Sequence, residues 1–313
     1  MTTPGLPTVL NTLHGPIRLP AYVPVTTFGG KYPLDDLVRP YLPRLAPAAM
    51  VSFYYAKQMK ERPEFPMFID SGGFASLFQN ARVIDASGLG LLQTTTDDEV
   101  QTLRPMEVLE FQERFADVAF TLDFPIPPSM ELAEAERRQR VTIANARWAI
   151  RNRRKKDMLL YACVQGWSVA SYADCARAYL EENFDGIAIG GLVPRCGDVS
   201  EILAIVNAVR KVVPSHPVHV FGIGNPDLVK LLFSQGVQSV DSSSYVKLAA
   251  DGRLWGEAAP RLTDASPAER LSLALCNLAF ATQSTMPLST SHLLFGPRRT
   301  AAPEMQQIPY VSS

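Results

Sequence analysis

Several short apolar runs of the sequence are each followed directly by polar residues or by glycines. The polar residues are Asp70 after Met67–Ile69, Asp123 after Val118–Leu122, Gln165 after Leu159–Val164 and Asp241 after Gln238–Val240. The glycine turns are Gly190-Gly191 after Gly186–Ile189 and Gly222-Ile223-Gly224 after Val218–Phe221. In a barrel of parallel strands the site forms at the carboxyl ends of the strands, so we expect these groups to converge.

Three carboxylates, one carboxamide and flexible turns at one edge predict a site for a flat polar ligand. A carboxylate accepts hydrogen bonds from the ring N–H and amine of a guanine, and Gln165 can donate to a ring acceptor. Glycines allow such a ligand to approach the backbone closely. Two other carboxylates could divide the work as in retaining glycosidases, one as nucleophile and one as acid/base. No histidine ends any of these runs, which argues against a Ser-His-Asp hydrolase.

The runs that carry these residues are continuously apolar, as in parallel strands buried on both faces. Helical patterns lie between them. One face combines Tyr172, Cys175, Ala176, Tyr179 and Leu180. A second helix has Asn225 as its predicted N-cap, followed by proline. The repeated strand–helix units predict an α/β fold, a TIM-like (β/α)₈ barrel, over residues 1–258. A C-terminal helix and flexible tail are expected over 259–313, and a long loop near the barrel mouth over 84–98.

The composition agrees with a globular protein of this size and gives few hints of a partner. The 313 residues are 47% apolar and carry a net charge of −1, so the overall charge does not indicate a nucleic-acid partner. Four widely spaced cysteines form no CxxC pair and are expected to be reduced. The N-terminus lacks the pattern of a signal peptide, and the apolar stretch over 271–281 is too short to span a bilayer. We therefore expect a cytoplasmic protein with no membrane partner.

An ordered series of motifs resembles the catalytic domain of the tRNA-guanine transglycosylase family. The series comprises DSGGF at 70–74, LRPMEVLEFQ at 103–112, TLDFP at 121–125, RQRVTIANARWAIR at 138–151, VQG at 164–166, IGGL at 189–192, FGIGNPDLV at 221–229 and DSSSYVKLAADGR at 241–253. The likeness covers about residues 15–255, and the order of the motifs is more specific than any one of them.

The resemblance implies a role for each matching position. Asp241 would be the nucleophile that displaces guanine and holds the sugar covalently, and Asp70 would be the acid/base. The residues implied to bind the base are Asp123, Gln165, Gly190, Gly191, Gly222, Ser71, Phe74 and Ile223. Those expected to contact the nucleic-acid backbone are Arg195, Lys247 and Arg253, which follow strand-end motifs. The target nucleotide would leave its stack to reach the site.

Three departures from the family pattern narrow the expectation. The CxCxxC…His zinc site is missing, since only Cys276 and His292 lie beyond Asp241. We therefore expect no metal and no cofactor. Ala75 replaces the glutamine that ends the family's DSGGFQ motif. We also expect no RNA-binding domain after the last motif. A compact, zinc-less chain resembles the branch of the family that inserts 7-deazaguanines, such as preQ₀, into DNA. DNA is the expected polymer on this ground, with tRNA as the alternative and accessory proteins as possible partners.

The residues at the strand ends also fit less specific roles. Asp70, Asp123 and Asp241 stand in good turn or N-cap sequences, and Gln165 could serve only to hold a loop. The four histidines are expected to be structural. The protein could also be a catalytically inactive subunit, although it keeps both Asp70 and Asp241. A barrel that binds phosphate at Gly190-Gly191 and Gly222–Gly224 is a third hypothesis.

Overall fold

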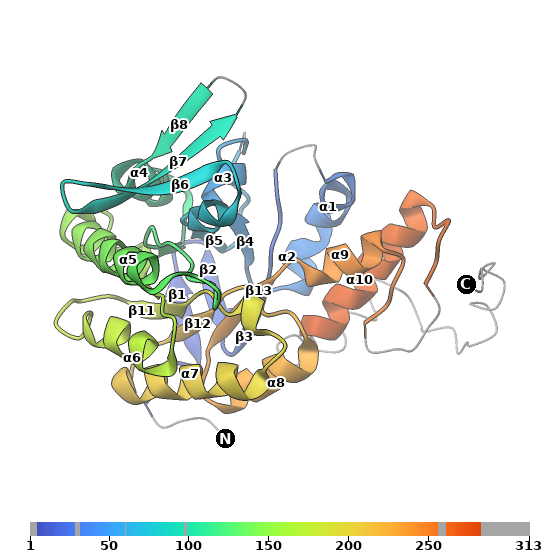
Figure 1. Ribbon diagram of the computed structural model, residues 1–313. Helices are drawn as coiled ribbons and strands as arrows, with labels where there is room; N and C mark the ends of the chain where they lie inside the picture. The colour runs from blue at the N-terminus through green and yellow to red at the C-terminus, as the bar shows by residue number, and fades with distance from the viewer. Residues whose placement is uncertain (1–4, 29–31, 60, 97–98, 256–260, 283–313) are drawn as a thin grey trace.

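The computed structural model describes residues 5–28, 32–59, 61–96, 99–255 and 261–282. Eight parallel strands surround a central axis (Figure 1). They are β3 (Ala21–Pro24), β4 (Ala49–Ser52), β5 (Met67–Asp70), β9 (Val118–Phe120), β10 (Leu159–Val164), β11 (Gly186–Ile189), β12 (Val218–Val220) and β13 (Ser239–Ser242). Their order is β3-β13-β12-β11-β10-β9-β5-β4. A bridge between Val25 and Met50 joins the two ends of this sheet, so the predicted TIM-like barrel is confirmed.

All six apolar runs singled out in the sequence are strands of this barrel. The strands β3 and β4 were not predicted. Prolines lie within or near both segments, at Pro20, Pro24 and Pro47, and proline in a segment argues against a buried strand.

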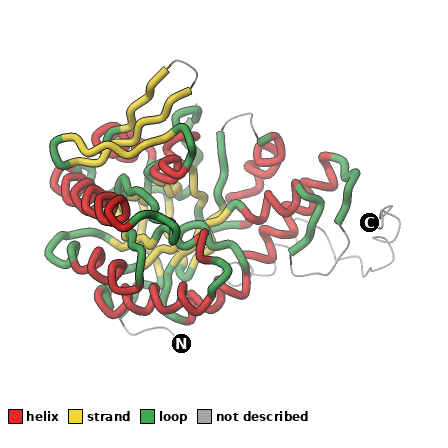
Figure 2. Tube along the Cα trace, viewed as in Figure 1, coloured by secondary structure: helices red, strands yellow, loops and turns green. Residues whose placement is uncertain are grey.

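The helices lie around the strands, and a helix or helical turn follows each strand (Figure 2). They are α1 (Pro33–Val38), α2 (Leu42–Leu45), α3 (Phe53–Ala56), α4 (Pro105–Phe115), α5 (Leu132–Asn152), α6 (Val169–Arg177), α7 (Val199–Val212), α8 (Pro226–Ser234), α9 (Ser244–Ala250) and α10 (Pro267–Thr282). Three 3₁₀ turns complete them: η1 (Arg39–Tyr41), η2 (Gly73–Leu77) and η3 (Val193–Arg195).

Local sequence signals explain where two of these helices lie. The side chain of Asn225 accepts hydrogen bonds from the N–H groups of Asp227 and Leu228, which confirms it as the N-cap of α8. The predicted apolar face of α6 is buried at Tyr172, Cys175, Ala176 and Tyr179. Leu180 is 51% exposed, because α6 ends at Arg177 and the chain leaves the helical path before it.

The loop predicted over residues 84–98 is wrong. Residues 84–96 belong to an antiparallel sheet of β6 (Ala81–Ala86), β7 (Leu89–Thr96) and β8 (Glu99–Leu103), which stands beside the barrel at the top of Figure 1. Residues 97 and 98 lie outside the described part of the chain. Asn145 of α5 holds the sheet by exchanging two hydrogen bonds with the backbone of Gly90, at 2.9 and 3.0 Å. A second small hairpin pairs β1 (Val9–Thr12) with β2 (Gly15–Arg18).

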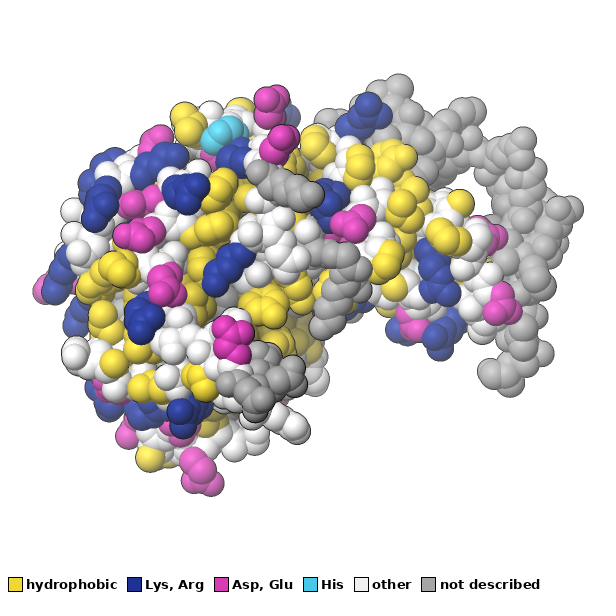
Figure 3. All heavy atoms as spheres, turned by 90° about the horizontal axis from the view of Figure 1, so that it is seen from above, with side chains coloured by type: hydrophobic (Ala, Val, Ile, Leu, Met, Phe, Trp, Pro, Cys, Tyr) yellow, Lys and Arg dark blue, Asp and Glu magenta, His cyan; other side chains and the backbone are white. Residues whose placement is uncertain are grey.

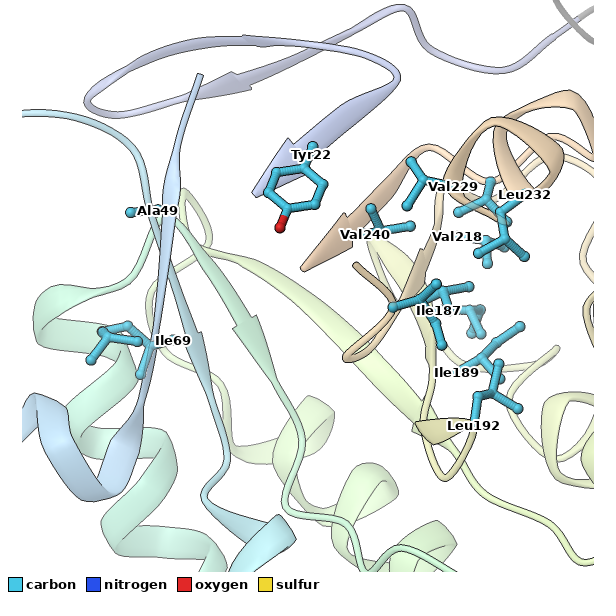
Figure 4. Close-up of a cluster of buried hydrophobic side chains, with 14 of the residues drawn as sticks. Tyr22, Ala49, Ile69, Ile187, Ile189, Leu192, Val218, Val229, Leu232 and Val240 are labelled. Atoms are coloured by element: carbon cyan, nitrogen blue, oxygen red, sulfur yellow. The ribbon is translucent and has the colours of Figure 1, made fainter. Parts of the chain in front are cut away.

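Two clusters of apolar side chains hold the barrel together. The larger one lies between the strands and the surrounding helices, and Figure 4 shows part of it around Ile187, Val218 and Val240. The smaller one fills the inside of the barrel with large rings, among them Phe68 and Phe120. Alternate residues of each strand contribute to the two clusters, so a side chain one position along a strand changes layer.

The C-terminal helix α10 packs on α9 and α1 and places Leu273 and Leu278 in the larger cluster. Its polar residue Asn277 donates to the backbone oxygens of Tyr245 and Arg253, at 3.1 and 3.0 Å. The division of the chain at residue 258 stays a prediction, and the expected tail over 283–313 lies outside the described residues. No helix in the described part of the chain is both long and apolar enough to span a membrane. A cytoplasmic location stays a prediction.

Candidate active site

Asp241 lies at the carboxyl end of β13 and is 7% exposed. One of its oxygens, Oδ1, accepts a hydrogen bond of 3.1 Å from the N–H of Gly222 and contacts Nε2 of His219 at 3.0 Å. Gly222 can aim its N–H there because it adopts a φ of +74°, which favours glycine. The side chain of Asp241 is thereby fixed at the mouth of the barrel.

Asp70 ends strand β5, at the same edge of the sheet. Its Oδ1 accepts a hydrogen bond of 2.7 Å from the N–H of Gly72, which adopts a left-handed conformation at φ +77°. Burial raises the pKa of Asp70 to about 7, and the charges of Asp241 and Asp123 add to the rise, whereas hydrogen bonds from Gly72 and Ser52 oppose it. A carboxyl group with a pKa near neutrality can both donate and accept a proton, as an acid/base must.

Asp123 lies just beyond β9 and is held from two sides. Nε2 of Gln165 donates to its Oδ2 at 2.6 Å, and the hydroxyl of Ser71 donates to its Oδ1 at 2.9 Å. All three side chains are buried. Burial raises the pKa of Asp123, and the hydrogen bonds from Gln165 and Ser71 counteract that rise. The sequence predicted Asp123 and Gln165 as neighbours, but it did not predict that Ser71 would hold the carboxylate.

The amide nitrogen of Gln165 donates to Asp123, so only the amide oxygen, Oε1, remains for another partner. Within the described part of the chain, the buried Oε1 of Gln165 has no hydrogen-bond partner. The expectation that Gln165 donates to a ligand therefore changes. As placed, the remaining polar atom of Gln165 is an acceptor and not a donor, and the side chain is completely buried.

The backbone of Gly190 and Gly191 runs directly over this pair. A Cβ on Gly190 would lie 2.2 Å from Nε2 of Gln165, and one on Gly191 would lie 2.7 Å from its Oε1. Gly191 also adopts a φ of +70°. Glycine is required here because the main chain approaches the amide of Gln165 too closely for any side chain.

Arg195 does not lie where a phosphate contact would require. Its side chain is fully buried, and it donates to the backbone oxygens of Ile126, at 3.1 Å, and Gly191, at 2.5 Å. It also pairs with Glu201. The guanidinium therefore holds the Gly191 turn from behind. The sequence pattern could not show this, since a basic residue after a strand-end motif can point either way.

The other predicted positions lie at different depths. Ile223 is 1% exposed and belongs to the larger apolar cluster, so its side chain contributes packing. Phe74 is 56% exposed and packs edge-to-face on Phe78. Lys247 on α9 is exposed, as is Arg253, which pairs with Asp251 at 2.8 Å. The roles of these residues stay predictions.

The surface seen in Figure 3 has no continuous basic field. Basic and acidic side chains alternate over this face of the molecule. This agrees with the net charge of −1, and a nucleic-acid contact would have to rest on local groups such as Lys247 and Arg253.

His219 is a residue beside Asp241 that the sequence did not single out. It lies in the middle of β12, is completely buried and contacts the carboxylate of Asp241. The expectation that the four histidines are structural stays a prediction, and for His219 the contact with Asp241 makes a further role worth testing. The available signal was a polar residue at the centre of the apolar run Val218–Phe221, a position that faces the inside of the barrel.

The residues do not fit the zinc site of the resembling family. That site needs three cysteines and a histidine close together after the barrel. Beyond Asp241 the chain has the single Cys276, on α10, while Cys163 and Cys175 are buried in β10 and α6. Among the described residues no group of three possible ligands lies together. The absence of a metal or another cofactor stays a prediction.

This arrangement combines two kinds of chemistry at one barrel mouth. Asp241 presents a carboxylate held in one orientation, and Asp70 presents a carboxyl group with a pKa near 7. Beside them, Asp123, Gln165 and the glycine backbone form a flat, buried polar surface. Such a set suits the displacement of a base from a sugar carbon with the base held by its polar edge.

The chain is similar to known proteins of one family. A family model described as queuine tRNA-ribosyltransferase matches residues 54–287. Three curated relatives are each named tRNA-guanine(15) transglycosylase. The relative from Methanothermobacter thermautotrophicus is 30% identical over 255 residues, which are 79% of this chain and 36% of the relative. The one from Methanocaldococcus jannaschii is 34% identical over 183 residues, which are 55% of this chain and 27% of the relative. The one from Methanosarcina barkeri is 28% identical over 250 residues, which are 78% of this chain and 49% of the relative. The chain spans less than half the length of each of these relatives.

Proposed function

Because this chain belongs to the queuine tRNA-ribosyltransferase family, we propose that it exchanges a guanine in tRNA for a free base. Asp241 is the nucleophile in this proposal and Asp70 the acid/base. The incoming base is guanine or a 7-deazaguanine such as preQ₀. The observation that carries the proposal is the convergence of Asp70, Asp123 and Asp241 at one edge of the barrel, where the charges of the other two act on Asp70.

The exchange proceeds in two displacements. An oxygen of Asp241 attacks C1′ of the nucleotide, the bond from C1′ to the guanine breaks, and its electron pair leaves with the base. Asp70 gives its proton to the departing guanine. The incoming base then returns a proton to Asp70 and attacks C1′, which releases Asp241 as a carboxylate. One residue serves as acid and then as base, as in retaining glycosidases.

Asp123, Gln165 and the Gly190-Gly191 backbone hold the base during both steps. Asp123 offers carboxylate lone pairs, and Gln165 offers Oε1, which has no partner among the described residues. N–H groups of a guanine edge match both acceptors. In this proposal Phe74 and Gly222 contact the base, and Lys247 and Arg253 contact phosphates.

The polymer is tRNA rather than the DNA expected from the sequence. The expectation of DNA was based on the compactness of the chain and on its missing zinc ligands, and neither feature contacts or distinguishes the polymer. The three curated relatives are all named for tRNA, which supports the alternative. A catalytically inactive subunit is less well supported, since both carboxylates lie at the barrel mouth. Accessory proteins are possible further partners, and the test below measures whether the chain exchanges the base without them.

The direct test supplies radiolabelled guanine with either bulk tRNA or duplex DNA. We expect label in tRNA only, and none with Asp241→Ala. Label in DNA only would overturn the choice of polymer and keep the chemistry. No label in either polymer from a folded protein would contradict base exchange by this chain alone.

A further inference from the structure

His219 lies one layer below Asp241 inside the barrel. It faces inward from β12 because its neighbours Val218 and Val220 face outward into the larger cluster. On the adjacent strand β13, Ser239 pairs in register with His219, and Asp241 lies two residues further on the same face. The imidazole therefore spans from the level of Ser239 to the level of Asp241.

Both ring nitrogens of His219 have a partner. Nδ1 lies 2.8 Å from the hydroxyl of Ser239, and Nε2 lies 3.0 Å from Oδ1 of Asp241. A carboxylate can only accept hydrogen bonds, so Nε2 carries the proton. In the neutral ring Nδ1 is then the acceptor, and the hydroxyl of Ser239 donates to it.

The rings around the imidazole keep it in this position. Phe68, Phe120 and Phe221 have centroids 5.9, 5.0 and 4.8 Å from that of His219. Such close packing leaves the imidazole little freedom to rotate away from Asp241.

We infer that His219 is a positioning residue for the nucleophile, an inference that rests on the proposed function. Oδ1 of Asp241 receives two donors, Nε2–H of His219 and N–H of Gly222. Oδ2 is the oxygen turned to the substrate, and it forms the bond to C1′ as the bond to guanine breaks. In the glycosyl ester that results, Oδ1 is the carbonyl oxygen. The same two donors hold it, and they stabilise the charge that returns to the carboxylate when the incoming base attacks.

The test compares two amides at position 219. The nitrogen of His219→Gln can occupy the place of Nε2, whereas that of His219→Asn reaches only the place of Nδ1. Loss of one well-placed donor lowers kcat about 10²-fold, so we expect this loss in His219→Asn, with KM for guanine nearly unchanged. In His219→Gln we expect kcat to recover most of that loss. His216→Gln is the matched control, because His216 lies in the turn before β12 and should leave exchange unchanged.

Several outcomes would overturn the inference. A wild-type kcat in His219→Asn would do so, as would equal losses in the Asn and Gln variants, which a purely structural role predicts. Should His219→Asn fail to fold, Ser239→Ala removes the hydroxyl that fixes the tautomer and must lower kcat without changing KM. If wild type and His216→Gln both lack exchange activity, the proposed function itself fails. An active wild type beside an unaffected His219→Asn refutes only the role of His219.

Discussion

The side-chain amide of Gln165 donates to the carboxylate of Asp123 over 2.6 Å, and this bond leaves Oε1 of Gln165 buried without a partner in the described part of the chain. A buried polar atom without a hydrogen bond costs about 1–3 kcal/mol, which a bound base with a suitable N–H would recover. The pair therefore favours a ligand that brings donors, as the edge of a guanine does.

Gly190→Ala should damage base binding through this pair. The new Cβ would lie 2.2 Å from Nε2 of Gln165, so the amide must move away from Asp123. A displacement of about 1 Å in a site can cost about 10²-fold, and we expect that loss in kcat/KM for guanine. Gly197→Ala is the control: nothing lies within 4 Å of its Cβ, and its kcat/KM should stay within roughly twofold of wild type.

The pH dependence should report the ionisation of Asp70. Burial raises its pKa to about 7, so the side chain is mostly protonated at pH 6 and mostly ionised at pH 8. Departure of the guanine needs the protonated form. We therefore expect kcat/KM for tRNA to be level below about pH 7 and to fall about tenfold per pH unit above it. The pH profile of Asp70→Asn, measured on its residual activity, should lack this fall in kcat/KM. An unchanged fall would assign the titration to another group.

Arg195→Ala should act on stability rather than on RNA affinity alone. The guanidinium is buried and supports the backbone oxygens of Ile126 and Gly191, and its loss leaves Glu201 unpaired. Leaving these backbone oxygens without their donor should lower the free energy of unfolding by about 1–3 kcal/mol, which urea unfolding would measure. Arg253→Ala, at an exposed position, should unfold like wild type and weaken tRNA binding in a salt-dependent manner. The reverse pattern would restore the phosphate role predicted for Arg195.

Asn145→Ala should loosen the β6–β8 sheet. Its side chain forms three buried hydrogen bonds, two with the backbone of Gly90 and one with the oxygen of Leu122. Leaving these backbone groups unpaired should cost at least about 1–3 kcal/mol. Hydrogen exchange would show faster exchange of β7 amides. Asn152→Ala, on the exposed end of the same helix, is the comparison and should leave β7 protected.

The sequence predicted the barrel because buried parallel strands leave continuous apolar runs that recur at regular intervals. It missed β3 and β4, whose segments contain or adjoin prolines, and it interpreted residues 84–98 as a loop. Gly90 and the polar residues around it suggested a turn-rich segment. In the structure Gly90 is required by the close approach of Phe124 and Val141, which only tertiary packing reveals.

From the sequence, only those site residues that directly follow an apolar run could be predicted. Asp70, Asp123, Gln165 and Asp241 do lie at one edge, and their detailed roles stay predictions. Arg195 and Arg253 both follow strand-end motifs, but the side chain of Arg195 is buried and that of Arg253 is exposed, a difference that the sequence does not show. His219 was overlooked because a side chain in mid-strand reaches the site only when the neighbouring strand places its carboxylate one layer above. Such a relationship depends on the register between β12 and β13.

The proposed mechanism requires that Asp241 carry the sugar covalently. We would incubate the protein with tRNA in the absence of added base, denature it, digest it with protease and nuclease, and map the adduct by mass spectrometry. We predict a ribosyl adduct on the peptide that contains Asp241, absent from an Asp241→Asn variant that still binds tRNA. An adduct on Asp70 or on another residue, or base exchange by Asp241→Asn, would contradict this claim.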